Sequence, residues 1–405
     1  MAVMTAAADV HRTGRDEHAQ HFTWDGLDVV ADRSRARAEH AWTSLEAFET
    51  AAMFQSRSFV SAWAQVATGT VGETLVYVVG RRGEEPVFVL PLAVTRKLGA
   101  RVLTWAAQSH ANYGMGLFHP DLIAEFARGA RDIDALIMAV GRAVDADIVH
   151  LENQPAVWAA RPNPFAASVR AMRSANDTFV LPLEDDFQKQ YKRLFSGRTL
   201  SNLKRKQRKL EDFGTPAFET PREASRRDRM LGWFFATKTA QLATSGRGSP
   251  FSEVEVQDLY RSLARDVARF DIEALNVGDT HVAMGLSMRE GRTCYLLNSV
   301  HQGAEFARCS PGALLLHRMV AAAHANGARV YDFGPGELPY KLEWEPQVTP
   351  LLFTTHLVNP VHVVAYAVLV FKALAKAKVK RHPRLSALVR QVRALKARVR
   401  QGGEA

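Results

Sequence analysis

One stretch late in the sequence gathers side chains that can exchange protons. An expected strand at 330–333 carries Asp332 and runs into a loop rich in Gly and Pro. Ligands of open α/β sheets collect at the edge where such strands end. Acyl transfer to an amine needs one group that takes a proton and one that donates to the thioester carbonyl or the leaving thiolate. A carboxylate together with a phenol or an ammonium supplies both.

The loop after this strand adds three more candidates for the same cleft, namely Glu337, Tyr340 and Lys341. Asp332 is the candidate base, with Glu337 in reserve. Tyr340 is the candidate proton donor to a thiolate, and Lys341 is a candidate holder of a phosphate or carboxylate. For each residue taken singly, a structural role is the alternative.

The sequence before this strand predicts a helix start that suits an anion. Ser310, Pro311 and Gly312 precede an apolar stretch that ends at Gly327. Ser is a good N-cap, and Pro is tolerated at the first helical position. The free N–H groups of a helix start, together with its positive dipole end, attract anions such as a diphosphate. The alternative is an ordinary well-capped helix.

A basic segment at 186–212 contains nine lysines and arginines and no acid between Asp186 and Glu211. A solvated helix face explains this pattern as well as a cradle for phosphates does. In the second interpretation, the substrate contacts are Arg198, Lys204 and Arg205.

These residues need a scaffold, and the chain predicts the same one twice. Helix, three strands, helix and strand follow each other over 55–151 and again over 221–333. A repeated order of this kind indicates two related α/β (α+β) domains. We expect a disordered lead-in over 1–40, domains over 41–183 and 184–356, and a basic tail over 357–405.

The net charge of +10 lies in the tail, where eleven lysines and arginines occur between 372 and 400 without an acid. The body is therefore near neutral, which makes a nucleic-acid-coating function unlikely. Two cysteines and no signal-peptide pattern favour the cytoplasm. The fourteen histidines show no metal-ligand spacing.

The tail opens with an apolar run at 361–371, shorter than the about 20 residues that cross a bilayer. Apolar residues then alternate with Arg and Lys at helical spacing over 385–399. A basic amphipathic helix suits the anionic inner face of a membrane, which predicts a peripheral contact. A helix packed on the body and a nucleic-acid-binding arm are the alternatives.

One motif is specific enough to indicate a family. The sequence Asp332-Phe333-Gly334-Pro335-Gly336-Glu337-x-Pro339-Tyr340-Lys341-x-x-Trp344, after Ser310-Pro311-Gly312, resembles the signature of the CelD-like (cellulose-biosynthesis-type) GNAT acetyltransferases. These enzymes are relatives of the Fem-type peptidoglycan-bridge enzymes. The resemblance covers about residues 42–350.

The resemblance implies two tandem GNAT-like domains, each a mixed, mostly antiparallel sheet flanked by helices, with acetyl-CoA or another acyl-CoA as co-substrate. The strand edge with Leu297, Asn298 and Val300 would pair with the pantetheine arm. The backbone around Arg308, Ser310, Gly312 and Ala313 would hold the diphosphate. Only part of the usual Gly-x-Gly or Gly-x-Ala phosphate loop follows Arg308, and Fem-type relatives use aminoacyl-tRNA instead.

We therefore expect an acyl-CoA-dependent N-acyltransferase that acts on an amine or amino sugar in surface polysaccharide or cell-envelope biosynthesis. Two alternatives stay open. One is Fem-type aminoacyl or peptidyl transfer, and the other is a non-catalytic scaffold of a polysaccharide-export complex.

Overall fold

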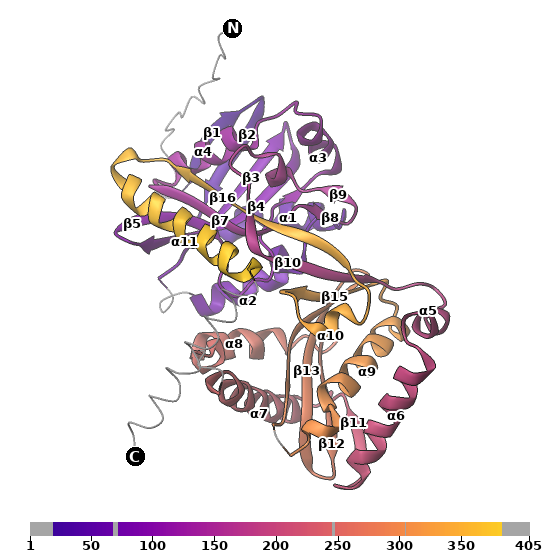
Figure 1. The fold of residues 1–405 in the computed structure, drawn as a ribbon. Coiled ribbons are helices and arrows are strands. Elements are labelled where there is room, and N and C mark those ends of the chain that lie inside the picture. Colours follow the sequence, from indigo (N-terminus) through magenta and orange to yellow (C-terminus); the bar gives the residue numbers. More distant parts are fainter. Residues whose placement is uncertain (1–18, 68–71, 245–247, 304, 383–405) are drawn as a thin grey trace, which may run out of the picture. The chain divides into compact units, whose positions relative to one another are not determined.

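The computed structural model describes residues 19–67, 72–244, 248–303 and 305–382. The chain forms two compact units, which Figure 1 colours along the sequence. The first unit comprises the chain up to Asp177 together with the later segment Thr349–Arg381. The second unit comprises Thr178–Val348. Both are mixed α/β folds in which helices flank a sheet, as the sequence predicts.

The sheet of the first unit has the strand order β1-β2-β3-β4-β5-β7-β16. Neighbours are antiparallel except β5 and β7, which are parallel. The strands are β1 (Gln20–Trp24), β2 (Leu27–Asp32), β3 (Thr74–Arg82), β4 (Glu85–Lys97), β5 (Ala100–Trp105), β7 (Ile148–Pro155) and β16 (Gln347–Leu357), with the short β6 (Leu117–Phe118), β8 (Val157–Trp158) and β9 (Arg161–Pro162). The helices are α1 (Arg35–Glu46), α2 (Arg57–Ala67), α3 (Pro120–Ala127), α4 (Ile133–Ala143) and α11 (Val363–Arg381).

The sheet of the second unit has the order β10-β15-β14-β13-β12-β11, in which only β14 and β15 are parallel. The strands are β10 (Met172–Pro182), β11 (Pro216–Glu219), β12 (Phe270–Val277), β13 (Thr280–Glu290), β14 (Thr293–His301) and β15 (Val330–Pro335). The helices are α5 (Phe187–Leu194), α6 (Gly197–Glu211), α7 (Ala224–Ala243), α8 (Val254–Leu263), α9 (Pro311–Ala325) and α10 (Pro339–Leu342).

The repeated element order is present in both units. The meander β3-β4-β5, the helices α3 and α4 and strand β7 correspond to the meander β12-β13-β14, helix α9 and strand β15. In each unit the third meander strand and the strand after the helix form the parallel pair. The one helix expected after the three strands of the first unit is two helices, α3 and α4, separated at 128–132.

Helix α9 is held against its sheet by an apolar stripe. Leu315, Met319 and Val320 are buried in the core of the second unit. Their spacing of one helical turn places them on one face. Gly285 on β13 makes the close approach possible, because a Cβ there would lie 2.4 Å from the Met319 sulfur. This packing fixes where α9 begins.

The expected disordered lead-in over 1–40 is wrong from residue 20 onward. A β-hairpin formed by β1 and β2 buries Phe22, Trp24, Leu27 and Val29. Asp25 and Gly26, both at positive φ, form its two-residue turn. The alternation of buried and exposed residues with a central Asp-Gly is a hairpin signal, which the charged composition of this segment obscured.

The expected domain boundaries are also wrong at both ends of the second domain. That domain begins at Thr178, and β16 belongs to the first unit, where it pairs antiparallel with β7. The alternation within 347–357 identifies a strand but cannot name its partner, because pairing is decided by contacts between distant residues.

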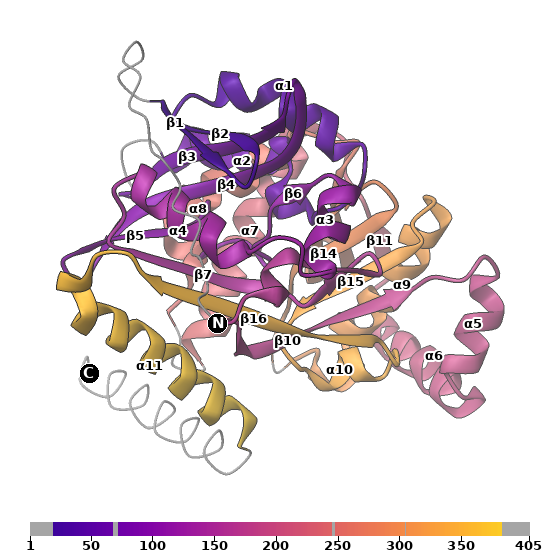
Figure 2. The ribbon, with the colours of Figure 1, turned by 90° about the horizontal axis from the view of Figure 1, so that it is seen from above.

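The first part of the expected tail is ordered helix. Helix α11 packs Ala365, Tyr366 and Leu369 against β5 and β7, beside β16 (Figure 2). The apolar run was predicted to be too short to cross a membrane. The helical stretch from Pro360 to Arg381, of 22 residues with mean hydropathy 1.5, is long and apolar enough to do so by length and composition. The expected amphipathic helix at 385–399 lies outside the described residues.

Candidate functional site

The two parallel strands of the second unit part from each other halfway along. Strand β14 pairs with β15 from Thr293 to Tyr295, and the last matched pair is Tyr295 with Asp332. On its other side β14 stays paired with β13 as far as His301. The edge of β14 beyond Tyr295 therefore faces a gap between the strands, where its N–H and C=O groups have no β15 partner.

A β-bulge marks the same part of β14. The register with β13 shifts between Leu296 and Asn298, so that Leu297 is the extra residue. Leu297 and Asn298 are half-buried, whereas the side chain of Val300 is fully buried and offers only its backbone to a ligand. Bulges re-aim backbone groups and often border active sites. The three residues predicted for the donor thus lie along one strand edge.

Helix α7 adds a lysine to this strand that the sequence did not single out. The Nζ of Lys238 donates a hydrogen bond of 2.7 Å to the carbonyl oxygen of Ser299. Lys238 stands among unremarkable helical residues, and only the packing of α7 on β14 brings it here. No local signal in the sequence pointed to it.

The start of α9 follows β14 after a short 3-10 turn at Ala307–Cys309. Ser310 adopts a left-handed conformation (φ 49°, ψ 55°) and its side chain makes no capping bond, so the prediction that it caps the helix in the usual way is wrong. Its carbonyl oxygen accepts the N–H groups of Ala313 and Leu314. A Cβ on Gly312 would lie 3.2 Å from the His301 ring, which leaves little room for any larger residue.

Arg308 does not point into this helix start. Its guanidinium lies 3.8 Å from the Asp212 carboxylate at the end of α6 and 5.0 Å from the centroid of the Phe213 ring. The side chain is largely exposed, so this contact is weak and leaves the guanidinium accessible to another anion.

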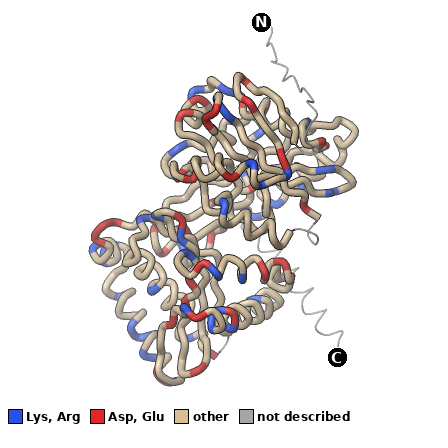
Figure 3. Tube along the Cα trace, turned by 180° about the vertical axis from the view of Figure 1, so that it is seen from behind, with Lys and Arg blue, Asp and Glu red and all other residues tan. Residues whose placement is uncertain are grey.

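Helix α6 packs through its leucines and turns its basic residues outward. Leu210 is fully buried, and the last turn of the helix lies beside the 3-10 turn that precedes α9. Arg198, Lys204 and Arg205 are exposed; Arg205 donates to the neighbouring Asn202. Figure 3 shows lysines and arginines next to acidic residues over both units. These three predicted substrate contacts are not brought to the gap between β14 and β15 by any hydrogen bond or ion pair among the described residues.

Two of the predicted catalytic residues form hydrogen bonds to the backbone of the turn after β15. The carboxylate of Asp332 accepts the N–H of Gly334 at 2.6 Å. The Nζ of Lys341 donates to the carbonyl oxygens of Gly334 and Pro335 at 2.9 and 3.1 Å. Asp332 and Lys341 are only 1% and 3% exposed. The structure therefore brings these two side chains together around one residue.

The other two predicted catalytic residues differ from this pair. Tyr340 packs against the core, and burial raises its pKa to about 12, so its phenol stays protonated at neutral pH. Glu337 lies on the exposed loop between β15 and α10. Tyr340 can therefore give a proton, and Glu337 can be reached by a solvent-borne acceptor.

The imidazole of His317, on α9, is kept neutral. The Nδ1 of His317 lies 2.8 Å from the Tyr191 hydroxyl, and rings of Phe195 and Trp344 pack against it at 4.7 and 4.8 Å. Burial, with the charge of Lys206 as a smaller cause, lowers the pKa of His317 to about 4. This geometry favours a structural role.

The parallel strands of the first unit also part, but there the chain fills the gap itself. Strand β5 pairs with β7 only at Val102 and Leu103. Beyond them, the side-chain oxygen of Gln108 accepts the N–H of Glu152 at 3.0 Å and lies 3.4 Å from the N–H of Trp105. The backbone also approaches β7 closely at Gly114, where a Cβ would lie 2.7 Å from the Glu152 carbonyl oxygen.

In the second unit, the described residues of the segment that follows β14 do not fill the gap between β14 and β15. Gln302 bonds to the backbone of His281 and Val282 on β13, and the 3-10 turn that follows contacts α6. A ligand that lies along a strand edge therefore finds that edge in the second unit, whereas Gln108 occupies the equivalent position in the first.

A parallel strand pair that parts at a bulge, with a helix start directly after it, is the arrangement of the GNAT fold. Residues 197–342 match the family model described as an acetyltransferase (GNAT) domain. The second unit thus contains a GNAT domain, the fold of an acyltransferase, and the predicted enzyme class is confirmed.

Solved structures show the same fold over most of the chain. FemX is 12% identical, with a TM-score of 0.56 over 81% of this chain and 98% of its own. A conserved protein of unknown function from Bacteroides thetaiotaomicron is 10% identical, with a TM-score of 0.50 over 78% of this chain and 96% of its own. No curated protein matches the sequence. Among the described residues, no group of three or more His, Cys, Asp or Glu is arranged to hold a metal.

Proposed function

We propose that this protein transfers an acyl group from an acyl-CoA to an amine, with the donor bound in the gap between β14 and β15. The observation that carries the proposal is the parting of these strands after Tyr295 and Asp332, at a bulge, inside a GNAT domain. The filled gap of the first unit supports a single donor site per chain.

In this proposal the donor lies along β14 and ends at α9. The backbone of Leu297, Asn298 and Val300 bonds to the amide groups of the pantetheine arm. The start of α9 at Gly312 and Ala313 faces the diphosphate, because N–H groups and the dipole there attract anions. Ser310 shapes this turn through its backbone, and Arg308 exchanges its exposed contact with Asp212 for a phosphate.

The transfer itself needs two proton movements. The amine nitrogen forms a bond to the thioester carbonyl carbon, the carbon–sulfur bond breaks, and the amine loses a proton while the thiolate gains one. Asp332 stands where the strands part and is the proposed base, with Glu337 on the exposed loop as the second candidate. Tyr340 is the proposed donor to the thiolate. Lys341, whose ammonium is committed to two carbonyls, becomes a positioning residue.

The acceptor we propose is an amino sugar of a surface polysaccharide. The support is the resemblance of the segment from Asp332 to Trp344 to the CelD-like signature. The exposed arginines and lysines of α6 offer an anionic acceptor a docking face, with Arg198, Lys204 and Arg205 as its contacts.

The first test is calorimetric titration of the full chain with acetyl-CoA and longer acyl-CoAs, beside Gly312→Asp. We expect saturable binding that this variant loses, since a carboxylate there repels the diphosphate. Gly197→Asp places the same residue at the start of α6, where a Cβ meets nothing within 4 Å, and should bind normally. Absence of binding to every acyl-CoA would reject the proposal.

Fem-type aminoacyl transfer is the second candidate, and the basic residues of α5 and α6 favour it, because nine lysines and arginines over 186–212 suit a phosphate backbone. Charged tRNA would then compete with or replace acyl-CoA. Transfer that survives RNase treatment, together with acyl-CoA binding, would exclude this candidate.

We further propose that the enzyme works at an anionic membrane surface reached through α11. One face of α11 packs on its own unit, while Val364 and Phe371 on the rest of the helix, and Val361 in the 3-10 turn before it, are 73%, 72% and 83% exposed. Its last turn carries Lys378, Lys380 and Arg381, and no acid occurs in 360–381. An apolar face bordered by cations suits anionic lipid headgroups. Its packing favours a helix lying in the membrane plane.

Flotation with phosphatidylglycerol and phosphatidylcholine vesicles tests this contact. We expect binding to the anionic vesicles only, weakened by salt and by Val364→Asp with Phe371→Asp. Val169→Asp changes an equally exposed valine elsewhere in the first unit and should have no effect. Equal behaviour of all variants would rule out α11 as the contact.

A further inference from the structure

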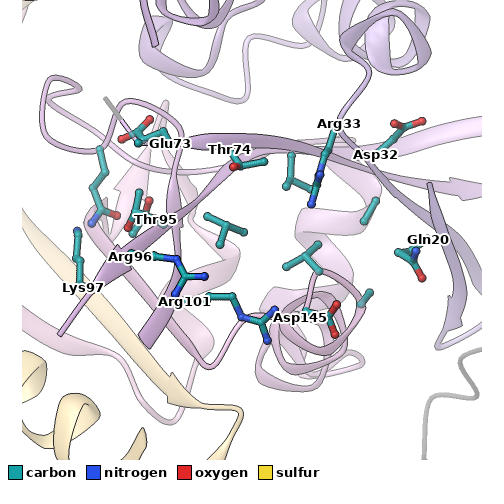
Figure 4. Close-up of a pocket in the computed structure, with 18 of the residues that line it drawn as sticks. Gln20, Asp32, Arg33, Glu73, Thr74, Thr95, Arg96, Lys97, Arg101 and Asp145 are labelled. Atoms are coloured by element: carbon teal, nitrogen blue, oxygen red, sulfur yellow. The ribbon is translucent and has the colours of Figure 1, made fainter. Parts of the chain in front are cut away.

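The first unit contains an open cleft whose lining includes Gln108 and Glu152, the residues that fill the gap between β5 and β7. The cleft has a volume of about 850 Å³ and lies between the sheet, the end of β2 and the end of α4. Ala31 and Val76 form a buried apolar floor, and Val144 closes one side. Figure 4 shows Arg33, Arg96 and Arg101 around its open centre. A cleft of this size accommodates a small organic ligand.

Two of these arginines are direct cross-strand neighbours. Arg96 on β4 and Arg101 on β5 are paired in the antiparallel register, so both side chains leave the same face of the sheet. Like charges placed opposite each other destabilise a strand pair. Arg33 reaches the same cleft from the residue after β2 (Figure 4). Three guanidinium groups from three parts of the chain thus converge without a shared counter-charge.

The acids nearby are already engaged, which leaves the arginines in excess. Asp32 binds Arg37, and Glu73 accepts the Trp63 indole N–H. Asp147 is 3.6 Å from the Nε of Arg101 and engages only that side of the guanidinium.

Among the remaining lining residues, Lys97 adds a positive charge, and the Glu152 carboxylate accepts a hydrogen bond from Gln108. Within the part of the chain that the structure describes, the side chains of Arg33 and Arg96 make no hydrogen bond or ion pair. Asp145 is the one lining acid among the described residues without such a partner.

We infer that this cleft binds an organic phosphate, with the phosphate between Arg33, Arg96 and Arg101 and the body of the ligand over the valine and alanine floor. Guanidinium groups bind phosphate through paired N–H···O bonds. Three of them exceed what one planar carboxylate can accept, whereas a phosphate monoester presents three oxygens. The hydroxyl of Thr74 borders the same space. The inference does not depend on the donor site of the second unit.

Thermal unfolding of the full chain tests the site with glucose 1-phosphate as probe and glucose at equal ionic strength as reference. We expect the phosphate to raise Tm saturably. The apparent affinity should fall about tenfold or more in Arg33→Gln and in Arg96→Gln, since each loses charge-assisted bonds. Arg128→Gln, an exposed arginine of the same unit away from the cleft, should respond like the unaltered chain.

Two readouts separate this site from others. Arg96→Gln without ligand should unfold at the same or a higher temperature than the parent, because it removes the repulsion from Arg101. The response should persist in Gly312→Asp, which blocks the donor site. A phosphate response that is unchanged in both arginine variants, or lost in Gly312→Asp, would overturn the inference, as would the absence of any response.

Discussion

Asp332 and Lys341 hold the same residue, Gly334, from its two sides. The carboxylate accepts its N–H and the ammonium donates to its carbonyl oxygen. Gly334 has a φ of 74°, a conformation that other residues rarely adopt. The turn that follows β15 is therefore fixed by two buried side chains, Asp332 and Lys341, and their contributions can be tested separately.

Replacing Lys341 with Met should remove the donor to two carbonyls while keeping the volume of the side chain. We expect a loss of roughly 2–4 kcal/mol in unfolding free energy, and a lower rate of transfer with little change in acyl-CoA affinity. Urea denaturation and initial rates measure these. Lys192→Met, on an exposed face of α5, serves as control. An unchanged rate in a folded Lys341→Met protein would remove its positioning role.

Asp332→Asn should keep the bond to Gly334, because an amide oxygen also accepts an N–H. We expect it to fold and to bind acyl-CoA but to transfer at least about a hundredfold more slowly. Glu337→Gln is the matched test of the reserve base. If Glu337→Gln is the slow variant and Asp332→Asn is not, the exposed carboxylate is the base.

His317 should make stability depend on pH in the acid range. Its pKa of about 4 in the folded chain lies below the usual 6.5, so the unfolded chain binds more protons between these values. Its contribution is complete above pH 6.5 and is lost as the pH falls toward 4, by on the order of 2–3 kcal/mol. Unfolding at pH 7 and pH 4.5 should show a smaller difference in His317→Gln, whose amide can still bond to the Tyr191 hydroxyl. His324→Gln should keep the parent profile.

Opening the filled gap of the first unit should not create a second donor site. Gln108→Ala leaves the N–H groups of Glu152 and Trp105 without this acceptor, which should cost roughly 1–3 kcal/mol of stability. Titration should still give one acyl-CoA per chain, because Gly114 remains in the gap. Gln65→Ala, exposed on α2, is the comparison. Two acyl-CoA molecules bound to the parent chain would contradict this assignment.

Local sequence patterns predicted many of the strands and helices. Strand alternation and the Pro311 and Gly327 signals placed β14, α9 and β15 nearly to the residue. They could not assign β16 to the first unit, because its pairing with β7 joins residues about 200 positions apart in sequence. The hairpin of β1 and β2 was missed because its exposed positions carry most of the charge.

The residues of the candidate site likewise fall into those that the sequence indicated and those that it did not. Element patterns in the sequence indicated Asp332 and Gly312 as candidates, and the family resemblance indicated the edge of β14. It could not foresee that Lys341 turns inward to two carbonyls, that Arg308 faces Asp212, or that Lys238 reaches Ser299 from α7. Side-chain direction at those positions depends on how distant elements pack.

The return of β16 and α11 to the first unit has a consequence for synthesis. On the ribosome, the edge of β7 and the apolar surface of Val102 and Ile148 emerge well before the residues that cover them. The edge of β7 in the first unit therefore stays unpaired until the whole second unit has been synthesised. Unpaired strand edges are prone to aggregation. A gene cut between the two units would leave a first half that lacks its last strand and a second half that carries β16 without its partner β7.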